Sequence, residues 1–464
     1  HIRGIFSMKK RIFSIISVIL VTFVLCSSLA LPVSATTSSN INKDSATISN
    51  FDFGCNVKTK SETVLLVNLD TGVTVYSKNA DVKRYPASLT KILTYIVVAE
   101  NVSDFNQKVK IKASVLKPLE GTGSSQSAVS DNIGKSFTIE QLLKCLMISS
   151  GNDAALVLAD YVGGEGGVTH FVQMMNDKAK ELKCKNTHFV NPHGLHDPNH
   201  YTTAEDIYKI ASYALMLPEF SDITNTISYT IGDTYYSSTN HLIDSTTEYY
   251  YQYAKGIKTG TTDQAGRCLV TQAVADGYSY MAVLMKAPYN EEQGIDEYYN
   301  MEDAAALFRW AFQNIELKEI VSRETPVCEE KVDLSWDKNS IQLSAEDDFN
   351  ILLPSSVKDK EITIKTDVPD SIDAPIKEGD YVGKASVYYK GEKVSTFNLV
   401  ADETVERSTL LYVLDILKNV FTSIYFIIAA IIVVILFAIY LFVVVKHNRQ
   451  KKSKKRRVKH YRDM

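Results

Sequence analysis

The chain has 464 residues, 45% of them hydrophobic, with 50 basic and 54 acidic side chains and a formal net charge of −4. Residues 446–464 hold ten of the basic and one of the acidic side chains, and residues 1–35 hold four basic and no acidic ones, so the remaining chain has 36 basic against 53 acidic side chains, about −17. A body this acidic excludes a nucleic-acid-binding protein. Six widely spaced cysteines without a CxxC pair argue against a disulfide framework or a zinc site.

The first 35 residues have the features of a secretory signal peptide. Met8–Arg11 gives a basic start, Ile12–Leu25 is an apolar run, and the small residues Val33 and Ala35 stand where a signal peptidase cleaves. An uncleaved N-terminal membrane anchor is the alternative. Residues 1–35 are therefore predicted to direct export.

A Ser/Thr/Asn-rich spacer over residues 36–59 precedes a mixed region of strands and helices over residues 60–318. Apolar runs on either side of Asp-Thr-Gly and Asp-Gly turns predict two hairpins. These are Thr63–Asn68 with Val73–Tyr76, and Cys268–Ala273 with Tyr280–Met285. Helix-start patterns lie between them at Thr138-x-x-Gln141 and Thr202-x-x-Glu205. Strands at both sequence ends with helices between predict an α+β fold: one antiparallel sheet, closed by its two chain ends, with a helical part packed on it.

Four further parts follow toward the C-terminus. Residues 320–405 hold short alternating runs broken by Pro, Gly and Asp, which predicts a small all-β domain. Residues 408–423 have leucines at helical spacing and are expected to lie on a membrane surface as an approach helix. Residues 424–445 are 22 residues without a charge, enough to span a hydrocarbon core of about 30 Å as a helix. The basic tail, residues 446–464, predicts a cytoplasmic C-terminus.

The first candidate catalytic motif is the Ser-x-x-Lys pair of Ser88 and Lys91. Pro86 sets the start of a helix that continues through the apolar run Ile92–Glu100, so Ser88 is expected in its first turn. Residues three apart share one helix face. A serine hydroxyl becomes a good nucleophile when a neighbour removes its proton, and a lysine with a lowered pKa can do so. A helix cap with a surface lysine is the alternative.

Two further motifs follow. Ser150 and Asn152 lie in a loop between two predicted helices, which can present both side chains into a cleft; Asn152 as a helix N-cap is the alternative. Lys258-Thr259-Gly260 precedes the predicted strand at Cys268 and suits an edge strand that a substrate backbone approaches closely. A simple hairpin bend is the alternative there.

The three motifs, in this order, resemble those of the penicillin-binding proteins and class A β-lactamases. The chain from about Thr63 to the end of the β domain resembles the D-alanyl-D-alanine carboxypeptidases among low-molecular-mass penicillin-binding proteins. The resemblance includes Ser150–Ala155, Asn191–Leu195 with Tyr201–Ala204, and Ala374–Gly379 with Gly383. It implies the penicillin-binding-protein fold and a serine carboxypeptidase that cleaves stem peptides ending in D-Ala-D-Ala, with β-lactams as covalent inhibitors.

The resemblance also implies a role for each matching residue. Ser88 corresponds to the nucleophile and Lys91 to its general base. Ser150 would relay a proton to the departing D-alanine, and Asn152 would hold the substrate amide. Lys258 and Thr259 would contact the terminal carboxylate beside Gly260. The backbone N–H groups of Ser88 and Thr261 would form the oxyanion hole.

One departure and three alternatives remain. Some relatives carry an arginine beyond the Lys-Thr-Gly strand that helps to orient the carboxylate, but residues 287–303 are acidic and contain no arginine. His193, His196 and His200 with Asp197 resemble an ordinary loop of the family, so no metal and no other cofactor is expected. A β-lactamase and a catalytically idle penicillin-binding scaffold are the alternative functions. The expected location is the cell membrane, with a single span and an extracellular catalytic domain.

Overall fold

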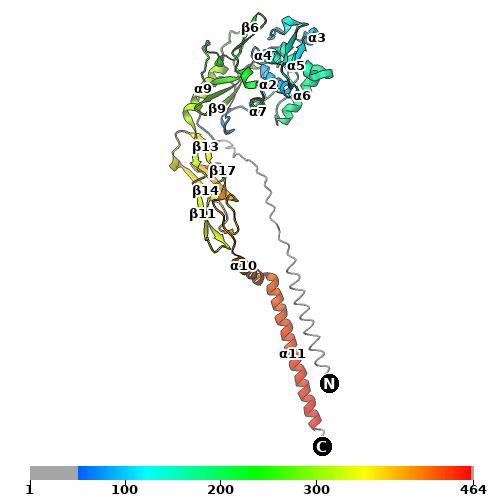
Figure 1. Ribbon diagram of the computed structural model, residues 1–464, viewed down its shortest axis with the longest axis vertical. Coiled ribbons are helices and arrows are strands. Elements are labelled where there is room, and N and C mark those ends of the chain that lie inside the picture. The colour runs from blue at the N-terminus through cyan, green and yellow to red at the C-terminus, as the bar shows by residue number, and fades with distance from the viewer. Residues whose placement is uncertain (1–50, 461–464) are drawn as a thin grey trace. The chain divides into compact units, whose positions relative to one another are not determined.

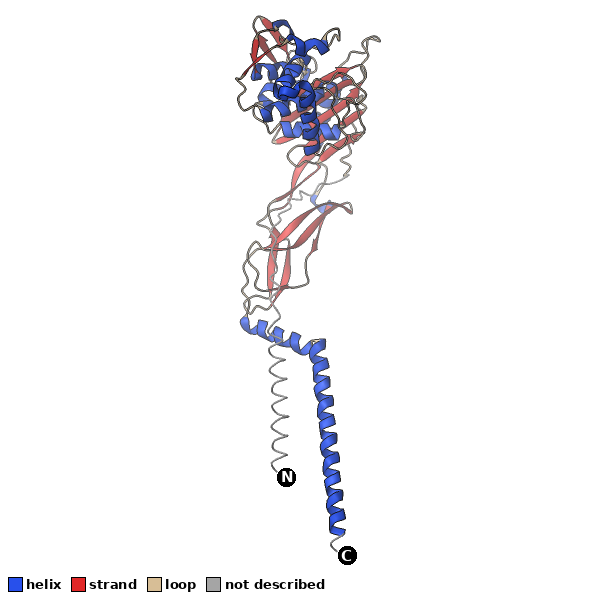
Figure 2. Ribbon diagram, turned by 90° about the vertical axis from the view of Figure 1, so that its right-hand side faces the viewer, coloured by secondary structure: helices blue, strands red, loops and turns tan. Residues whose placement is uncertain are grey.

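A computed structural model describes residues 51–460 of the chain (Figures 1 and 2). The predicted signal peptide lies outside the described residues. The N-terminal part combines an antiparallel sheet with helices, the next part consists of strands, and two helices follow toward the C-terminus (Figure 2).

A five-stranded antiparallel sheet forms the centre of the first part. Its strand order is β2 (Thr74–Lys78), β1 (Thr63–Asn68), β9 (Tyr278–Ala287), β8 (Gly266–Ala275) and β7 (Ala254–Thr262). The first and last strands in sequence, β1 and β9, pair with each other, so the predicted closure of the sheet by its two chain ends is confirmed. Strand β7 is an edge strand, with its outer side unpaired within the described residues.

Both faces of this sheet are covered, because successive residues of a strand point to opposite sides. In β1, Leu65 and Val67 join one hydrophobic core, while Val64 and Leu66 join a second. This explains why β1 is a continuous apolar run rather than an alternating one.

The helices divide between the two faces (Figure 1). The first core contains residues from the 3-10 helix η1 (Ala87–Leu89) and from α2 (Thr90–Asn101), α4 (Ile139–Met147), α5 (Asn152–Gly163), α6 (Gly167–Glu181) and α7 (Ala204–Ala214). The second core contains α9 (Tyr299–Asn314). Smaller elements complete this part: β3 (Lys108–Lys110), α3 (Ala113–Leu116), β4 (Ser136–Thr138), α8 (Phe220–Thr224), β5 (Ser228–Ile231) and β6 (Thr234–Ser237).

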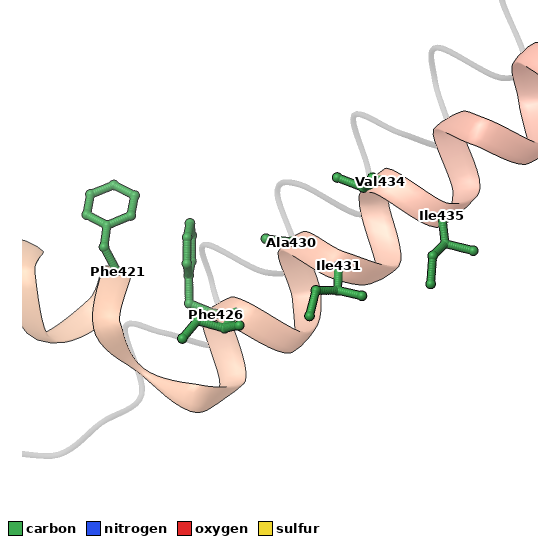
Figure 3. A pocket seen from close by; sticks show the side chains of 7 residues that line it. Phe421, Phe426, Ala430, Ile431, Val434 and Ile435 are labelled. Atoms are coloured by element: carbon green, nitrogen blue, oxygen red, sulfur yellow. The ribbon is translucent and has the colours of Figure 1, made fainter.

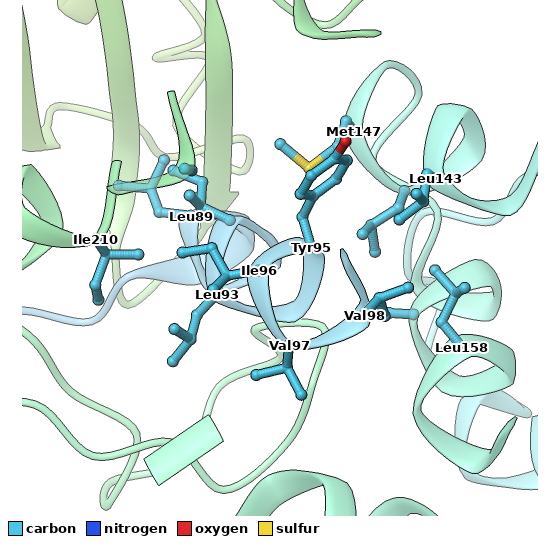
Figure 4. Close-up of a cluster of buried hydrophobic side chains, with 14 of the residues drawn as sticks. Leu89, Leu93, Tyr95, Ile96, Val97, Val98, Leu143, Met147, Leu158 and Ile210 are labelled. Carbon is cyan, nitrogen blue, oxygen red and sulfur yellow. The ribbon is translucent and has the colours of Figure 1, made fainter. Parts of the chain in front are cut away.

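Helix α2, which follows η1, is central to the first core. Its residues Leu93, Tyr95 and Val98 are fully buried and lie among side chains of neighbouring helices, including Leu143 and Leu158 (Figure 4). Burying side chains on nearly every turn fixes this helix against its neighbours. The start of the helix, where the Ser-x-x-Lys motif lies, is therefore rigidly placed.

One predicted helix start is off by one residue. The capping box of Thr138 and Gln141 is present at the start of α4. At α7, however, the N-cap is Thr203, whose hydroxyl accepts a hydrogen bond from the Asp206 backbone N–H. Thr202 is unavailable because its backbone bridges to Arg84 and its hydroxyl contacts that of Thr187.

The second part is all-β, as predicted. Strands β10 (Ile315–Val321) and β13 (Phe349–Pro354) pair in an antiparallel ladder. A six-stranded sheet has the order β14 (Ile362–Asp367), β16 (Tyr381–Tyr389), β17 (Glu392–Ala401), β12 (Ser340–Ala345), β11 (Cys328–Asp333) and β15 (Ile372–Asp373). Its own core includes Leu343, Val387 and Leu399.

Two helices, α10 (Thr409–Thr422) and α11 (Ile424–His460), complete the described chain. Residues Ile424–Gln450 are long and apolar enough to cross a membrane. Where the helices meet, Phe421, Phe426 and Ile431 line a hollow made of hydrocarbon side chains (Figure 3). In water such a surface would be unfavourable, so a lipid bilayer is its natural surrounding.

Candidate active site

Ser88 lies in the tight turn η1, directly before α2. This differs slightly from the expected first turn of an α-helix. The preceding residue, Ala87, has φ +48°, a left-handed conformation that is strained for a residue with a side chain. The loop residue Gly194 packs on this turn so closely that an added Cβ would lie 1.9 Å from the Ala87 carbonyl oxygen. The surrounding structure therefore holds the Ser88 turn in place.

A buried chain of hydrogen bonds through Thr90 and His200 supports the same turn. The Thr90 hydroxyl donates to the Ala87 carbonyl at 2.8 Å and lies 2.7 Å from His200 Nε2. The other ring nitrogen of His200 accepts from the Val190 backbone N–H at 3.2 Å. Burial lowers the pKa of His200 to about 3, so the ring is neutral and donates from Nε2 to Thr90.

Lys91 Nζ lies at the centre of the site, with three oxygen atoms around it. Ser88 Oγ is 2.9 Å away, Asn152 Oδ1 is 2.6 Å away and the His193 carbonyl oxygen is 2.8 Å away. The amide and carbonyl oxygens can only accept, so they use two N–H groups of the amine. In a neutral amine the remaining position is a lone pair, and it faces the Ser88 hydroxyl. The arrangement thus suits a base that accepts the serine proton.

The electrostatics of Lys91 favour this neutral form. Its side chain is fully buried. Burial first, and the charge of Lys258 second, hold the pKa of Lys91 well below its usual 10.5, against a smaller opposite effect of Asp153. A lysine in this environment loses its proton much more readily than a lysine in water.

Ser150 and Asn152 come from the connection between α4 and α5. Ser150 has φ +60°, a second left-handed residue in the site. The alternative in which Asn152 caps α5 is wrong, because Gly151 occupies the N-cap position and the Asn152 side chain contacts Lys91 instead. A Cβ on Gly151 would come within 2.6 Å of Asp153 Oδ1. This connection therefore needs glycine in order to direct its two polar side chains inward.

Asp153, the residue after Asn152, ties this connection to the segment that contains Ser127 and Ser130. Its buried carboxylate accepts hydrogen bonds from the backbone and hydroxyl groups of Ser127 and Ser130, at 2.8–3.0 Å. A carboxylate that accepts this many hydrogen bonds holds the neighbouring backbone in place and is not free to act as a base.

The Lys-Thr-Gly motif lies on the edge strand β7. Lys258 Nζ donates to Ser150 Oγ and to the Thr259 carbonyl, each at 2.9 Å. Burial lowers the pKa of Lys258 to about 7. The Thr259 hydroxyl lies 2.5 Å from that of Thr239. The motif is thus joined to the second motif through Ser150, as Asn152 joins the second motif to the first.

Gly260 explains how β7 comes so near to the serine. A Cβ at this position would lie 2.9 Å from the Ser88 backbone nitrogen and 3.1 Å from the Pro86 carbonyl oxygen. Only glycine permits this approach. Thr261 follows on the same strand and pairs with Arg267 of β8.

The loop Asn191–Leu195 contributes more than the sequence suggested. The His193 carbonyl accepts from Lys91, and the Asn191 side chain holds the loop by accepting from the Gly194 N–H at 2.7 Å. The Asn-Pro-His-Gly pattern was the available signal, but a backbone carbonyl leaves no mark of its own in a sequence. No group of three or more His, Cys, Asp or Glu side chains within residues 51–460 could hold a metal ion.

A serine next to a buried lysine, joined by hydrogen bonds to a second serine–lysine pair, is the arrangement expected of a serine hydrolase of the acyl-enzyme type. Residues 49–289 match the D-alanyl-D-alanine carboxypeptidase family, and residues 316–407 match the C-terminal domain of penicillin-binding protein 5. The chain belongs to this family and is a serine-type D-alanyl-D-alanine carboxypeptidase.

Individual relatives match this chain in sequence or structure over most of its length. The D-alanyl-D-alanine carboxypeptidase DacF of Bacillus subtilis is 28% identical over 354 residues, 75% of this chain and 87% of the relative. DacD of Escherichia coli is 30% identical over 356 residues, with 75% and 87% covered. The crystal structure of penicillin-binding protein 5 from Haemophilus influenzae matches with a TM-score of 0.61 and 27% identity, over 76% of this chain and 99% of that one.

Proposed function

We propose that this protein removes the terminal D-alanine from peptidoglycan stem peptides through an ester on Ser88, and that β-lactams acylate the same serine. The observation that carries the proposal is the environment of Lys91. Two obligate acceptors take its N–H groups, and its third contact is Ser88 Oγ at 2.9 Å. Burial favours the neutral amine that this role needs.

In the first step, Lys91 takes the Ser88 proton as the serine oxygen attacks the carbonyl carbon of the penultimate D-alanine. The carbonyl oxygen becomes an oxyanion that accepts hydrogen bonds from the backbone N–H groups of Ser88 and Thr261. Support for this pair comes from the close approach of Gly260 to the Ser88 nitrogen. Removal of one such donor costs about 3 kcal/mol of transition-state stabilisation.

In the second step, the C–N bond breaks and the terminal D-alanine leaves as an amine. The Ser150 hydroxyl gives this nitrogen a proton and recovers one from the Lys91–Lys258 network. Support comes from the 2.9 Å contact between Ser150 Oγ and Lys258 Nζ. Asn152 would hold the substrate amide with its side-chain N–H₂, since its oxygen is already bound to Lys91. Water then hydrolyses the ester and restores Ser88.

The C-terminal helices support attachment to a membrane. In the proposed arrangement, α11 spans the bilayer, α10 lies on its outer surface, and the basic residues after the span stay on the cytoplasmic side. The exposed apolar residues Leu410, Leu414 and Leu417 of α10 suit contact with lipid. The catalytic part would then face the extracellular side, where the peptidoglycan lies.

The test uses the full-length protein in detergent with a fluorescent penicillin and a synthetic pentapeptide ending in D-Ala-D-Ala. We expect a covalent label that Ser88→Ala abolishes, together with release of one D-alanine per peptide. A label without release of D-alanine would identify an idle scaffold, and rapid multiple turnover of penicillin would identify a β-lactamase. A Ser88→Ala protein that still labels would refute the nucleophile.

A further inference from the structure

A pocket of about 420 Å³ at one end of the five-stranded sheet is lined by three cations, Lys83, Arg84 and Lys286, and by no carboxylate. None of the three takes part in the hydrogen bonds that join Lys91 and Lys258 to the active-site serines. Because positive charge gathers in this pocket without a carboxylate in its lining, the pocket suits an anionic group.

Two of the three cations lack a carboxylate partner. Arg84 forms an ion pair with Glu62 at 3.1 Å. Lys83 Nζ lies 4.1 Å from the centroid of the Tyr201 ring, and Lys286 Nζ donates to the Gln264 carbonyl at 2.8 Å. Neither lysine forms an ion pair within residues 51–460. An ammonium group has three N–H donors, so both lysines keep donors for an incoming anion.

Lys286 reaches the pocket through an unusual backbone conformation. In β9, Met285 faces the first core and Leu284 the second, so strict alternation would turn Lys286 toward the second core. Its φ of +56° interrupts the alternation, and its side chain lines the pocket, whose wall residue Ala265 belongs to the first core. A left-handed residue with a side chain is strained, and such strain is frequent at functional sites.

Two segments that surround Ser88 continue into the walls of this pocket. Tyr85, a wall residue, comes three residues before Ser88 and is therefore at most about 11 Å from it. Strand β7 passes the Ser88 turn at Gly260, and the wall residue Gln264 follows four residues later. The pocket is thus a neighbour of the nucleophile, beyond the end of β7.

The proposed reaction directs the substrate toward this pocket. The departing D-alanine lies at Ser150, which contacts Lys258 near the middle of β7. The rest of the stem peptide is the other substituent of the carbonyl carbon, so it leaves Ser88 in the other direction, past Thr261 toward Gln264. This upstream part carries the free carboxylate of a γ-linked glutamate and, in some cell walls, that of the diamino acid. The glutamate carboxylate is about ten bonds from the scissile carbonyl, roughly 12 Å in an extended chain, which matches the distance to the pocket.

We propose that the pocket of Lys83, Arg84 and Lys286 binds a carboxylate of the stem peptide upstream of the scissile bond. This group is distinct from the terminal carboxylate, which departs with the D-alanine. Its recognition would make the enzyme prefer stem peptides with a free carboxylate over amidated ones. The inference rests on the proposed function, because the peptide must first be a substrate of Ser88.

The experiment measures kcat/KM for D-alanine release by the full-length protein in detergent from three synthetic pentapeptides. The first contains γ-glutamate and lysine, the second isoglutamine and lysine, and the third isoglutamine and diaminopimelate. The parent should prefer the first or the third peptide over the second by roughly tenfold, the effect of one charge-assisted contact. A preference for the first identifies the glutamate carboxylate as the ligand, and a preference for the third identifies that of the diamino acid.

Lys286→Gln should reduce this preference to less than about threefold and leave kcat/KM for the second peptide within about twofold of the parent. Lys83→Gln should act in the same direction, and the exposed Lys83 can be replaced without disturbing the fold. The ratio of two substrates within one variant does not depend on the fraction of folded protein.

Lys110→Gln is the matched control, because it removes the same charge from an exposed lysine that lines a different pocket. It should keep the preference of the parent. The inference is wrong if the parent does not distinguish the peptides, if the variants of Lys83 and Lys286 keep the full preference, or if Lys110→Gln reduces it equally. A parent that releases no D-alanine from any of the three peptides would instead overturn the proposed function, and this inference with it.

Discussion

Replacing Gly260 by alanine should impair catalysis while sparing the fold. The new Cβ would lie 2.9 Å from the Ser88 nitrogen, whereas ordinary contact begins at 3.4 Å, so β7 must move away by about 0.5 Å. The atoms it meets belong to the backbone of Ser88 and Pro86 and to the Cβ of Ala87, none of which is a flexible side-chain end. Because the proposed oxyanion donors, the N–H groups of Ser88 and Thr261, lie on the two sides of this contact, we expect acylation to slow roughly 100-fold.

The assay is the acylation rate of the full-length protein with fluorescent penicillin, measured beside its unfolding in urea. Gly163→Ala is the matched control, since its Cβ would also crowd a backbone atom, the Phe171 nitrogen at 3.3 Å, but away from Ser88 and Lys91. Both variants should be destabilised by no more than about 1–3 kcal/mol. If Gly260→Ala acylates within threefold of the parent, the strand does not form the wall of an oxyanion hole.

Three further predictions follow from the structure. Protease added to intact protoplasts should remove the bulk of the protein and spare an epitope fused after Met464; a tail cut from outside would reverse the orientation. Asp153→Ala should lower the free energy of unfolding by about 3 kcal/mol, because it leaves the buried donors of Ser127 and Ser130 unpaired; an unchanged urea midpoint would contradict this. The pKa of the buried Lys258 is about 7, whereas a lysine in the unfolded chain has a pKa of about 10.4. Between these two pH values the unfolded state holds one more proton than the folded state. The free energy of unfolding should therefore rise with pH by up to about 1.4 kcal/mol per pH unit. Lys258→Met should lose that part of the rise, and an equal slope in both proteins would show that Lys258 is charged in the fold.

The structure brings the three predicted motifs together in space. They could be found in the sequence because each is marked by its residue types and by its position at the end of a helix or strand. Ser88 and Lys91 were three apart at a helix start, and their contact follows from helix geometry. Ser150 and Asn152 followed a strong amphipathic helix, α4, whose predicted start at Thr138 and Gln141 is the one observed. The roles assigned to these residues stay predictions until the variants are measured.

Features that depend on long-range contacts were not predictable. Nothing local in the sequence joins Thr90 to His200, which is 110 residues away, or gives the His193 carbonyl a place beside Lys91. The shift of the α7 cap from Thr202 to Thr203 has the same origin, because tertiary bonds of Thr202 to Thr187 and Arg84 outweigh a local pattern. Residue propensity and motif spacing predict local structure only, whereas these contacts join segments that are far apart in the sequence.

The measurement that most directly tests the account is the pH dependence of acylation in the parent and in Lys91→Arg. If neutral Lys91 is the base, acylation of the parent should rise with pH as Lys91 loses its proton, at a pH well below its usual pKa of 10.5. Lys91→Arg should acylate at least about 100-fold more slowly at every pH, because a guanidinium keeps its proton. Lys258→Arg keeps a cation and should retain more activity. A Lys91→Arg protein that acylates nearly as fast as the parent would show that Lys91 acts only through its charge, and would contradict this mechanism.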